Sequence, residues 1–229
     1  MEKKKFKNYE FDDYASKYES LLKDSFPSFL RDIEYYTRYK VKLVHKHREN
    51  MSTKSILDYG CGVGLSLRYF SEYFPNSSIN GYDESNQSLK YAKDKVPKVN
   101  IYNYLENIPK NYFDVVFISN ILHHINENDH LKTILACRNF LKPEGHIYLF
   151  EHNPLNPITR IIFKKSPLDK HAKMIRLNNI VKLSQLAKMK IVNKQYNLFF
   201  PKQLSLLRFI ERLIKWIPIG AQYMIVLKK

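Results

Sequence analysis

Three glycines in one short segment are the residues of this chain best suited to hold a ligand. Gly60, Gly62 and Gly64 alternate directly after a short apolar run and the acid Asp58. A glycine has no Cβ atom, so the backbone can turn sharply there and a ligand can lie against it. The next residues, 65–70, have apolar side chains at helical spacing. The segment therefore predicts a strand, a tight turn and the start of a helix, with a large polar ligand at the carboxyl end of the strand.

A second acid supports this interpretation, because the glycine segment alone also fits an ordinary connection between a strand and a helix. Asp83 ends the next expected strand, about 20 residues after Gly64, where nucleotide-binding folds place a ribose-binding acid. A carboxylate only accepts hydrogen bonds, so it can bind both hydroxyl groups of one ribose. We therefore expect a cofactor that contains adenosine.

The glycine spacing distinguishes two cofactor classes. A dinucleotide site usually has the spacing G-x-G-x-x-G, which turns helix amides toward a pyrophosphate. Residues 58–64 instead read Asp-Tyr-Gly-Cys-Gly-Val-Gly, and an acid beside the loop suits a cationic ligand but repels a pyrophosphate. This segment resembles the first motif of the class I S-adenosylmethionine-dependent methyltransferases. The resemblance implies S-adenosyl-L-methionine as cofactor and S-adenosyl-L-homocysteine as product.

The same resemblance implies which residues hold the cofactor. Asp83 matches the family's ribose-binding acid, and Tyr18 would close over the cofactor, although a flexible terminus is the alternative for that segment. The family often has an acid near position 104, where this chain has Tyr104, so the adenine contact is expected from the backbone of Leu105 or from stacking on Tyr104. The predicted cofactor-binding residues are Tyr18, Asp58, Gly60, Cys61, Gly62, Gly64, Asp83, Glu84, Leu105 and Asn120.

The order of the expected elements predicts the fold. Residues 54–150 alternate strand and helix patterns five times, which is typical of a parallel sheet with crossover helices. The family resemblance implies an α/β, Rossmann-like class I methyltransferase fold, with a mostly parallel seven-stranded sheet, helices on both faces and a final antiparallel hairpin. We expect residues 1–50 to form a helical lead-in or lid, and residues 51–229 to form the methyltransferase domain.

Basic side chains are concentrated in the last third of the chain. Residues 151–229 hold 16 basic and 3 acidic side chains, whereas residues 1–150 hold 22 basic and 19 acidic ones. The imbalance predicts an anionic partner, such as a phosphate-bearing acceptor or a phospholipid surface. A solvated, lysine-rich surface is the other interpretation.

Composition also bears on the compartment. The chain has only two cysteines, no apolar run as long as a membrane span, and no apolar segment after its lysine-rich start. We therefore expect a cytoplasmic protein, with peripheral membrane contact as a further hypothesis.

That hypothesis depends on an amphipathic segment at about 204–217, which we expect to be a basic helix inserted between the last two strands. Arg208, Arg212 and Lys215 lie on its polar face, and the residues that flank an apolar face are Leu207, Ile210, Ile214, Trp216 and Ile217. Such a helix could lie in a membrane interface or cover a lipid-bearing substrate. Packing of the apolar stripe on the core or on a second subunit is the alternative.

Histidines after two expected strands are the candidates for a general base. Methyl transfer to a hydroxyl group requires removal of its proton, and a histidine with a near-neutral pKa suits this task. His124 follows the expected fourth strand and His152 the fifth, and we slightly prefer His152. A packing or hydrogen-bonding role is the alternative for each. No cluster of Cys, His and carboxylates has convincing metal-ligand spacing, so no metal site is predicted.

The loop that begins at His152 reads His-Asn-Pro-Leu-Asn-Pro, and two prolines within four residues stiffen it. It resembles a subset of these methyltransferases that is often associated with glycan biosynthesis. We expect Asn153 to hold an acceptor hydroxyl, Arg160 to pair with a phosphate or carboxylate, and His123 to contact the substrate.

These observations predict an S-adenosylmethionine-dependent methyltransferase that O-methylates a sugar-containing or anionic small molecule or glycan. A methyltransferase acting on lipid, natural product or RNA is the first alternative. Nucleic acid is disfavoured as a partner, because no recognisable RNA-binding module accompanies the domain. A non-catalytic, cofactor-binding partner subunit is the second alternative. The sequence leaves open the acceptor, the methylated atom and the oligomeric state.

Overall fold

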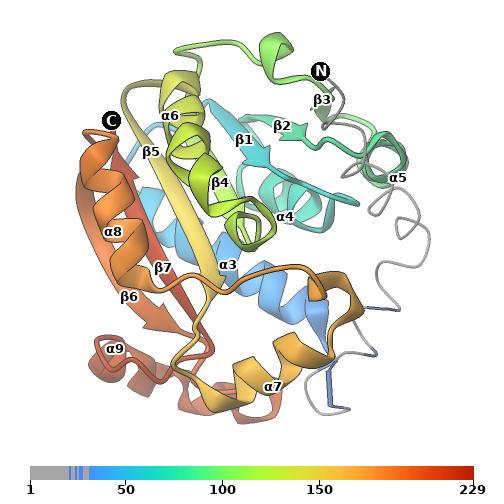
Figure 1. Ribbon diagram of the computed structural model, residues 1–229. Coiled ribbons are helices and arrows are strands. Elements are labelled where there is room, and N and C mark those ends of the chain that lie inside the picture. Colours follow the sequence, from blue (N-terminus) through green and yellow to red (C-terminus); the bar gives the residue numbers. More distant parts are fainter. Residues whose placement is uncertain (1–20, 22–23, 25, 28–30) are drawn as a thin grey trace.

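The computed structural model describes residues 21, 24, 26–27 and 31–229. Its strands are β1 (Ser55–Tyr59), β2 (Ser78–Tyr82), β3 (Asn100–Tyr102), β4 (Phe113–Ser119), β5 (Leu141–His152), β6 (Lys190–Asn197) and β7 (Gln222–Lys228). They form one seven-stranded sheet in the order β3-β2-β1-β4-β5-β7-β6 (Figure 1). The pairs from β3 to β5 are parallel, whereas β7 runs antiparallel to both β5 and β6. The predicted sheet, with its final antiparallel hairpin, is confirmed.

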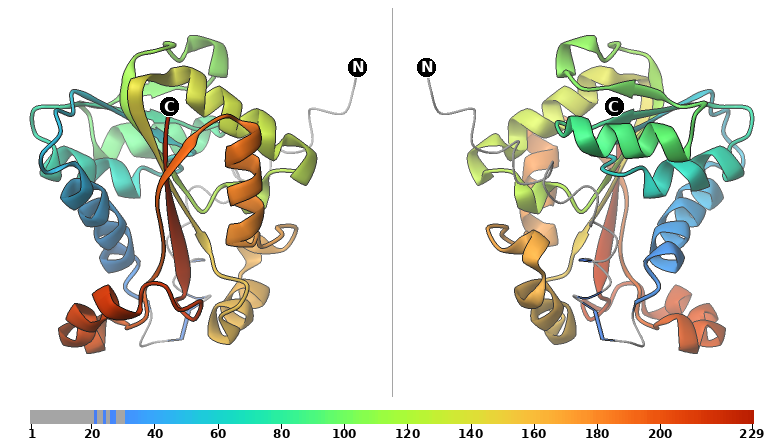
Figure 2. Two further views of the ribbon diagram at one scale, coloured as in Figure 1. Left: turned by 90° about the vertical axis from the view of Figure 1, so that its left-hand side faces the viewer. Right: turned by 90° about the vertical axis from the view of Figure 1, so that its right-hand side faces the viewer.

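Helices cover both faces of this sheet (Figure 2). The α-helices are α3 (Ile33–Arg48), α4 (Leu65–Tyr73), α5 (Asn86–Lys95), α6 (His130–Phe140), α7 (Pro157–Lys165), α8 (Leu177–Leu186) and α9 (Glu211–Ile214). The 3-10 helices are η3 (Leu105–Asn107), η4 (Leu122–His124), η5 (Glu127–Asp129), η6 (Pro167–Asp169) and η7 (Lys202–Ile210). One hydrophobic cluster joins the sheet to α6 and α8, and a second joins it to α3, α4 and α5.

Successive residues of the central strands supply these two clusters alternately, because side chains of a strand point to opposite faces of a sheet. In β5, Leu149 packs on the side of α6 and α8, and Phe150 packs on the side of α3 and α4. Both side chains are fully buried. The central strands are therefore apolar on both faces, as expected for a parallel sheet between two helical layers.

The parallel strands β1, β2, β4 and β5 have their carboxyl ends on the same side of the sheet. The register places Tyr59 beside Tyr82 and Ile118, and Ser119 beside Phe150. The segments that leave these strand ends are therefore neighbours, which is where ligands bind in open α/β sheets.

The segment between β6 and β7 differs from the single amphipathic helix expected at about 204–217. It forms η7, with a kink at Leu204, followed by the short helix α9. One residue of the expected polar face departs from the prediction: Arg208 packs inward, with its guanidinium 4.6 Å and 4.0 Å from the ring centroids of Tyr35 and Tyr39 on α3, whereas Arg212 and Lys215 are exposed as expected. Leu206 and Leu213 instead remain 88% and 74% exposed. Helical periodicity alone could not reveal this arrangement, because the stacking partners of Arg208 lie on a distant helix.

The substitution Leu149→Ala is expected to lower the free energy of unfolding by about 2–5 kcal/mol, because it opens a cavity in the centre of the sheet. Leu186→Ala on α8 is the matched control, since Leu186 is 66% exposed, and it is expected to change stability by less than about 0.5 kcal/mol. Urea denaturation of both variants measures the difference. Equal stability losses would contradict this account of the core.

Candidate active site

The glycine loop between β1 and α4 is held in a conformation that favours glycine. Gly60, Gly62 and Gly64 have φ angles of 77°, 50° and 79°, in the left-handed region. The amides of Gly60 and Cys61 donate to the carbonyl of Tyr82 at 2.7 Å and 2.9 Å, which fastens the loop to the end of β2. The predicted turn between strand and helix is thus tightly anchored.

The space around the loop differs from one glycine to the next. A Cβ atom at Gly60 would collide with the side chain of Ile121, and one at Gly64 would lie 2.9 Å from the Cα of Ala92. A Cβ atom at Gly62 would meet no atom of the described residues within 4 Å. The loop is therefore packed closely at its two ends and open at Gly62, which leaves room for a ligand.

Asp83 stands beside this opening in a fixed orientation. Its Oδ2 accepts a hydrogen bond from the amide of Gly62 at 2.8 Å, and its Oδ1 accepts one from the amide of Ser85 at 2.9 Å. Each carboxylate oxygen can accept a further hydrogen bond. Asp83 thus fits the predicted contact with ribose hydroxyl groups.

Asp58 lies on β1, just before the glycine loop, and is buried. The hydroxyl of Ser66 donates a hydrogen bond to its Oδ2. Burial raises the pKa of Asp58 to about 7. This environment supports a role in shaping the loop in addition to the predicted contact with the cofactor.

The other predicted cofactor residues lie in the glycine loop or follow the ends of neighbouring strands. Cys61 is buried in the loop, Glu84 is exposed after β2, and Leu105 lies in η3. Asn120 has a φ angle of 58° and accepts a hydrogen bond from Gln222 at 3.2 Å. Tyr18 lies outside the described residues, so its predicted role stays a prediction.

A second group of polar side chains begins next to the glycine loop. The residue that touches Gly60, Ile121, directly precedes η4, which carries His123 and His124. The buried carboxylate of Glu151 accepts the amides of Ile121 and Leu122 at 3.0 Å and 2.8 Å. The other oxygen of Glu151 lies 2.6 Å from Nδ1 of His123. Glu151 therefore fixes both the backbone and the first histidine of η4.

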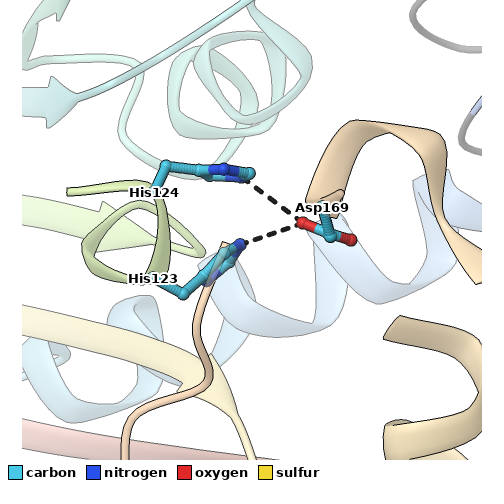
Figure 3. Close-up of side chains that lie close together, drawn as sticks. All are labelled: His123, His124 and Asp169. Carbon is cyan, nitrogen blue, oxygen red and sulfur yellow. Dashed lines mark ion pairs between the residues drawn. The ribbon is translucent and has the colours of Figure 1, made fainter. Parts of the chain in front are cut away.

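Asp169, from η6, completes the group on its outer side (Figure 3). Its Oδ1 lies 3.3 Å from Nε2 of His123 and 3.5 Å from Nε2 of His124. We call His123, His124, Glu151 and Asp169 the histidine–carboxylate cluster. His123 is buried, whereas the side chains of His124 and Asp169 are 23% and 10% exposed.

His123 and His152 have pKa values shifted in opposite directions. Burial lowers the pKa of His123, but the carboxylates of Glu151 and Asp169 outweigh it and raise the pKa to about 9. His152 lies with its ring centroid 5.3 Å from that of His123, and burial together with the charge of His123 lowers the pKa of His152 to about 3. His123 is therefore an imidazolium at neutral pH, and His152 is a weak base.

Two of the predicted acceptor residues, Asn153 and Arg160, do not belong to this cluster. The side-chain amide of Asn153 donates to the carbonyls of Pro218 and Gly220 and accepts the amide of Leu155. Arg160 is exposed on α7. The contacts of Asn153 favour a role in tethering two loops over the predicted contact with an acceptor hydroxyl.

The sequence interpretation missed Glu151 and Lys40 as parts of the site and did not connect Asp169 to the histidines. Lys40 is a buried lysine on α3 that donates to Ser119 Oγ at 2.8 Å, and burial lowers its pKa to about 8. A charged residue inside an apolar strand, such as Glu151, was a usable signal, because buried charges need partners. Nothing in the local sequence links Asp169 to η4.

Comparison with known proteins adds the family. Residues 57–149 match the family model described as a methyltransferase domain. This segment runs from β1 into β5 and contains the glycine loop, Asp83 and η4. The chain contains a class I S-adenosylmethionine-dependent methyltransferase domain. Its cofactor is S-adenosylmethionine, which fits the open space at Gly62 and the orientation of Asp83.

Relatives of the methyltransferase domain match over part of their length. A malonyl-[acyl-carrier protein] O-methyltransferase 2 of Ilyobacter polytropus is 33% identical over 102 residues, which is 41% of this chain and 37% of that protein. The matched segments of the three curated relatives span between 26% and 50% of their lengths.

Solved structures extend the likeness to the whole fold. A methyltransferase from Archaeoglobus fulgidus has a TM-score of 0.60 at 19% identity, covering 82% of this chain and 94% of that one. The plantazolicin methyltransferase BpumL, solved with S-adenosylhomocysteine, has a TM-score of 0.60 at 17% identity, covering 96% and 98%. Both show a similar fold around the methyltransferase domain.

The substitution Asp83→Asn is expected to weaken the binding of S-adenosylhomocysteine by tenfold or more, because a hydrogen bond to a charged acceptor contributes about 1.5–3 kcal/mol. Asp94→Asn, at an exposed position on α5, is the control with the same change in charge and should leave the affinity unchanged. Isothermal titration calorimetry measures both. Unchanged affinity in Asp83→Asn would remove the assigned contact.

Proposed function

We propose that this chain transfers a methyl group from S-adenosylmethionine to a hydroxyl oxygen of a sugar-containing or otherwise anionic small molecule or glycan. The observation that carries the proposal is the histidine–carboxylate cluster directly beside the glycine loop. Residues that could hold the cofactor and residues that could activate an acceptor therefore begin at neighbouring strand ends. The O-methyltransferase named among the relatives is in keeping with an oxygen acceptor.

The residues divide the work of methyl transfer between them. Bound S-adenosylmethionine supplies a methyl group on a positively charged sulfur, which leaves as a neutral thioether. The glycine loop and Asp83 hold the adenosine part, so that the acceptor can be aligned with the methyl group; such orientation supplies much of an enzyme's rate. His124 and Asp169, the partly exposed members of the cluster, activate the acceptor hydroxyl.

This proposal favours His124 over His152, the base preferred from the sequence. A hydroxyl acceptor needs a group that can help to remove its proton near neutral pH. The low pKa of His152 makes it a poor proton acceptor, and its ring lies against Phe163 with a centroid distance of 5.7 Å. We therefore give His152 a packing role beside His123. His123, which is buried between two carboxylates, positions Asp169.

The charge of the C-terminal third supports an anionic acceptor. Residues 151–229 hold 16 basic and 3 acidic side chains. Exposed basic side chains on α7 include Arg160, Lys164 and Lys165. Such a surface attracts phosphate or carboxylate groups.

The substitution His124→Ala is expected to lower the rate of methyl transfer by about 10²–10⁴-fold while leaving the binding of S-adenosylhomocysteine intact. The assay follows labelled methyl from S-adenosylmethionine into an extract of the source organism, separated into water-soluble, lipid and polymer fractions. His45→Ala is the control, since His45 packs on Tyr73 and Phe74 away from the cluster.

Label in the water-soluble or glycan fraction, lost in His124→Ala, would support the proposal. Label that persists in His124→Ala would exclude this residue from the reaction. Cofactor binding without label in any fraction would favour a non-catalytic subunit.

A lipid acceptor, or contact with a lipid surface, is a second candidate that one observation favours. Large apolar side chains of α7, η7, α9 and the loops beside them are exposed, and we call them the apolar platform: Leu155, Ile158, Ile161, Leu204, Leu206, Leu207, Phe209, Leu213, Trp216 and Ile219. Both ribbon figures place α7 and α9 at the same end of the molecule, and Figure 2 shows them on opposite sides of the sheet there. Lys165, Arg212 and Lys215 are exposed on the same segments. Apolar side chains among basic ones suit an anionic membrane surface.

Contacts with α3 and with Asp32, just before it, hold η7 and α9, which carry part of the platform, in place. Glu211 is buried and accepts a hydrogen bond from the hydroxyl of Tyr39 at 2.7 Å, and Lys202 pairs with Asp32 at 2.5 Å. These contacts fasten η7 and α9 to α3. The described part of the chain has no helix with the length and hydrophobicity needed to cross a bilayer.

The combined substitution Leu213→Ser with Trp216→Ser is expected to weaken binding to vesicles of phosphatidylcholine and phosphatidylglycerol by at least about tenfold, because burying each large apolar side chain contributes about 1.5–3 kcal/mol when complete. Leu186→Ser with Val192→Ser removes two other exposed apolar side chains and serves as the control. Co-sedimentation measures the bound fraction.

Stronger binding to these vesicles than to pure phosphatidylcholine is also expected. Absence of vesicle binding, together with a dimer that Leu213→Ser with Trp216→Ser dissociates in analytical ultracentrifugation, would assign the platform to a second copy of the chain instead.

A further inference from the structure

We propose that His123, His124 and Asp169 bind a divalent transition-metal ion, and that this ion activates the acceptor hydroxyl. The second half of the statement rests on the proposed function, whereas the first half stands on geometry alone. One donor atom from each of the three residues lies within 4.8 Å of the others. Two imidazole nitrogens thus converge on one carboxylate oxygen (Figure 3).

The distances fit metal ligands better than they fit hydrogen bonds. Oδ1 of Asp169 lies 3.3 Å from Nε2 of His123 and 3.5 Å from Nε2 of His124. Good N–H···O hydrogen bonds are about 2.7–3.2 Å long. Two ligands at about 2.1 Å from an ion at a tetrahedral centre lie about 3.4 Å from each other. Both separations between an imidazole and the carboxylate are therefore those of two ligands of one ion, and the two imidazole nitrogens lie within 4.8 Å of each other.

The outer contacts of His123 are those of a metal ligand. A ligating histidine usually donates its second ring N–H to a carboxylate, which fixes the ring and its tautomer. Glu151 lies 2.6 Å from Nδ1 of His123, on the side of the ring away from Asp169. The amides of Ile121 and Leu122 hold that carboxylate in place. Nε2 of His123 is thereby directed toward Asp169, and an ion bound there takes the place of the proton that the two carboxylates favour on this ring.

Charge and access also favour a cation. The carboxylates of Glu151 and Asp169 bring two negative charges to His123, which itself is buried. His124 and Asp169 are partly exposed, so an ion could enter from their side and keep coordination positions open. Two imidazoles and one carboxylate with open positions form a donor set used for Fe(II) and suited to Zn(II), Mn(II) or Co(II).

Such an ion would narrow the class of acceptor. A bound cation lowers the pKa of a hydroxyl group that contacts it, so the hydroxyl proton can pass to solvent water. The same ion can coordinate a second oxygen atom of the acceptor next to that hydroxyl. We therefore expect an acceptor whose methylated hydroxyl stands next to a second oxygen, as in a vicinal diol or a hydroxy acid. With the ion bound, the ion takes over from His124 the activation of the hydroxyl, and His124 contributes as one of its ligands.

The test uses the untagged full-length chain, freed of metal by a chelator and dialysed, and titrated with cobalt(II) chloride. Visible absorption of Co(II) with nitrogen and oxygen ligands, confirmed by calorimetry, is expected to saturate at one ion per chain. His124→Ala and Asp169→Asn are expected to weaken binding by more than about 100-fold, and Glu151→Gln by about 10- to 100-fold. His171→Ala, an exposed histidine two residues after Asp169, is the control and should bind as the wild type does.

No cobalt spectrum, or equal affinity in His124→Ala and the wild type, would overturn the proposal. Thermal unfolding checks that each variant is folded, and Asp169→Asn, which barely changes the shape of the side chain, is informative even if His124→Ala is unstable. Methyl transfer that persists in the metal-free chain would refute the ion's role in activation and leave the proposed function standing. Specific cobalt binding without methyl transfer in any extract would support the metal site and count against the proposed function.

Discussion

The histidine–carboxylate cluster depends on one buried carboxylate. Glu151 lies on the central strand β5, with no exposed surface, and accepts the amides that begin η4 as well as the ring of His123. A charge buried in this way is costly unless several partners satisfy it. Because those partners are the backbone of η4 and an imidazolium, the need to pair one carboxylate determines where both histidines of η4 lie.

The cofactor side follows a different constraint, which is steric. The glycine loop is closely packed against Ile121 and Ala92 at its ends and open at Gly62. Ile121 belongs to the same turn whose amide binds Glu151. The packing beneath the loop and the electrostatics of η4 are therefore coupled through a single residue, and Lys40, buried between Asp58 and Glu151, is electrostatically coupled to both acids. A substitution on one side of the site should be felt on the other.

The C-terminal segments show how tertiary contacts can turn a single basic residue of an amphipathic pattern inward. A helical wheel over residues 204–217 places the arginines outward, yet Arg208 stacks on Tyr35 and Tyr39, and Glu211 is buried against α3. Stacking of a guanidinium on two rings, together with a paired carboxylate, outweighs the preference of these charges for water. The apolar side chains on the other side consequently remain at the surface, beside basic residues of the same segments.

The sequence by itself determined the parallel part of the sheet, the glycine loop and the acid at the end of β2, because these depend on local periodicity, on the conformational freedom of glycine and on fixed spacing along neighbouring elements. The seven strands and the final antiparallel hairpin were expected from the resemblance to the methyltransferase family. The sequence also indicated the histidines after β4 and β5. Only the tertiary structure decided how these residues are used. It gave Asn153 a tethering role, made His152 a weak base through burial beside His123, and brought Asp169 from η6 to both histidines of η4. Those outcomes depend on burial and on contacts between residues far apart in the chain, and a local segment of sequence predicts neither of them.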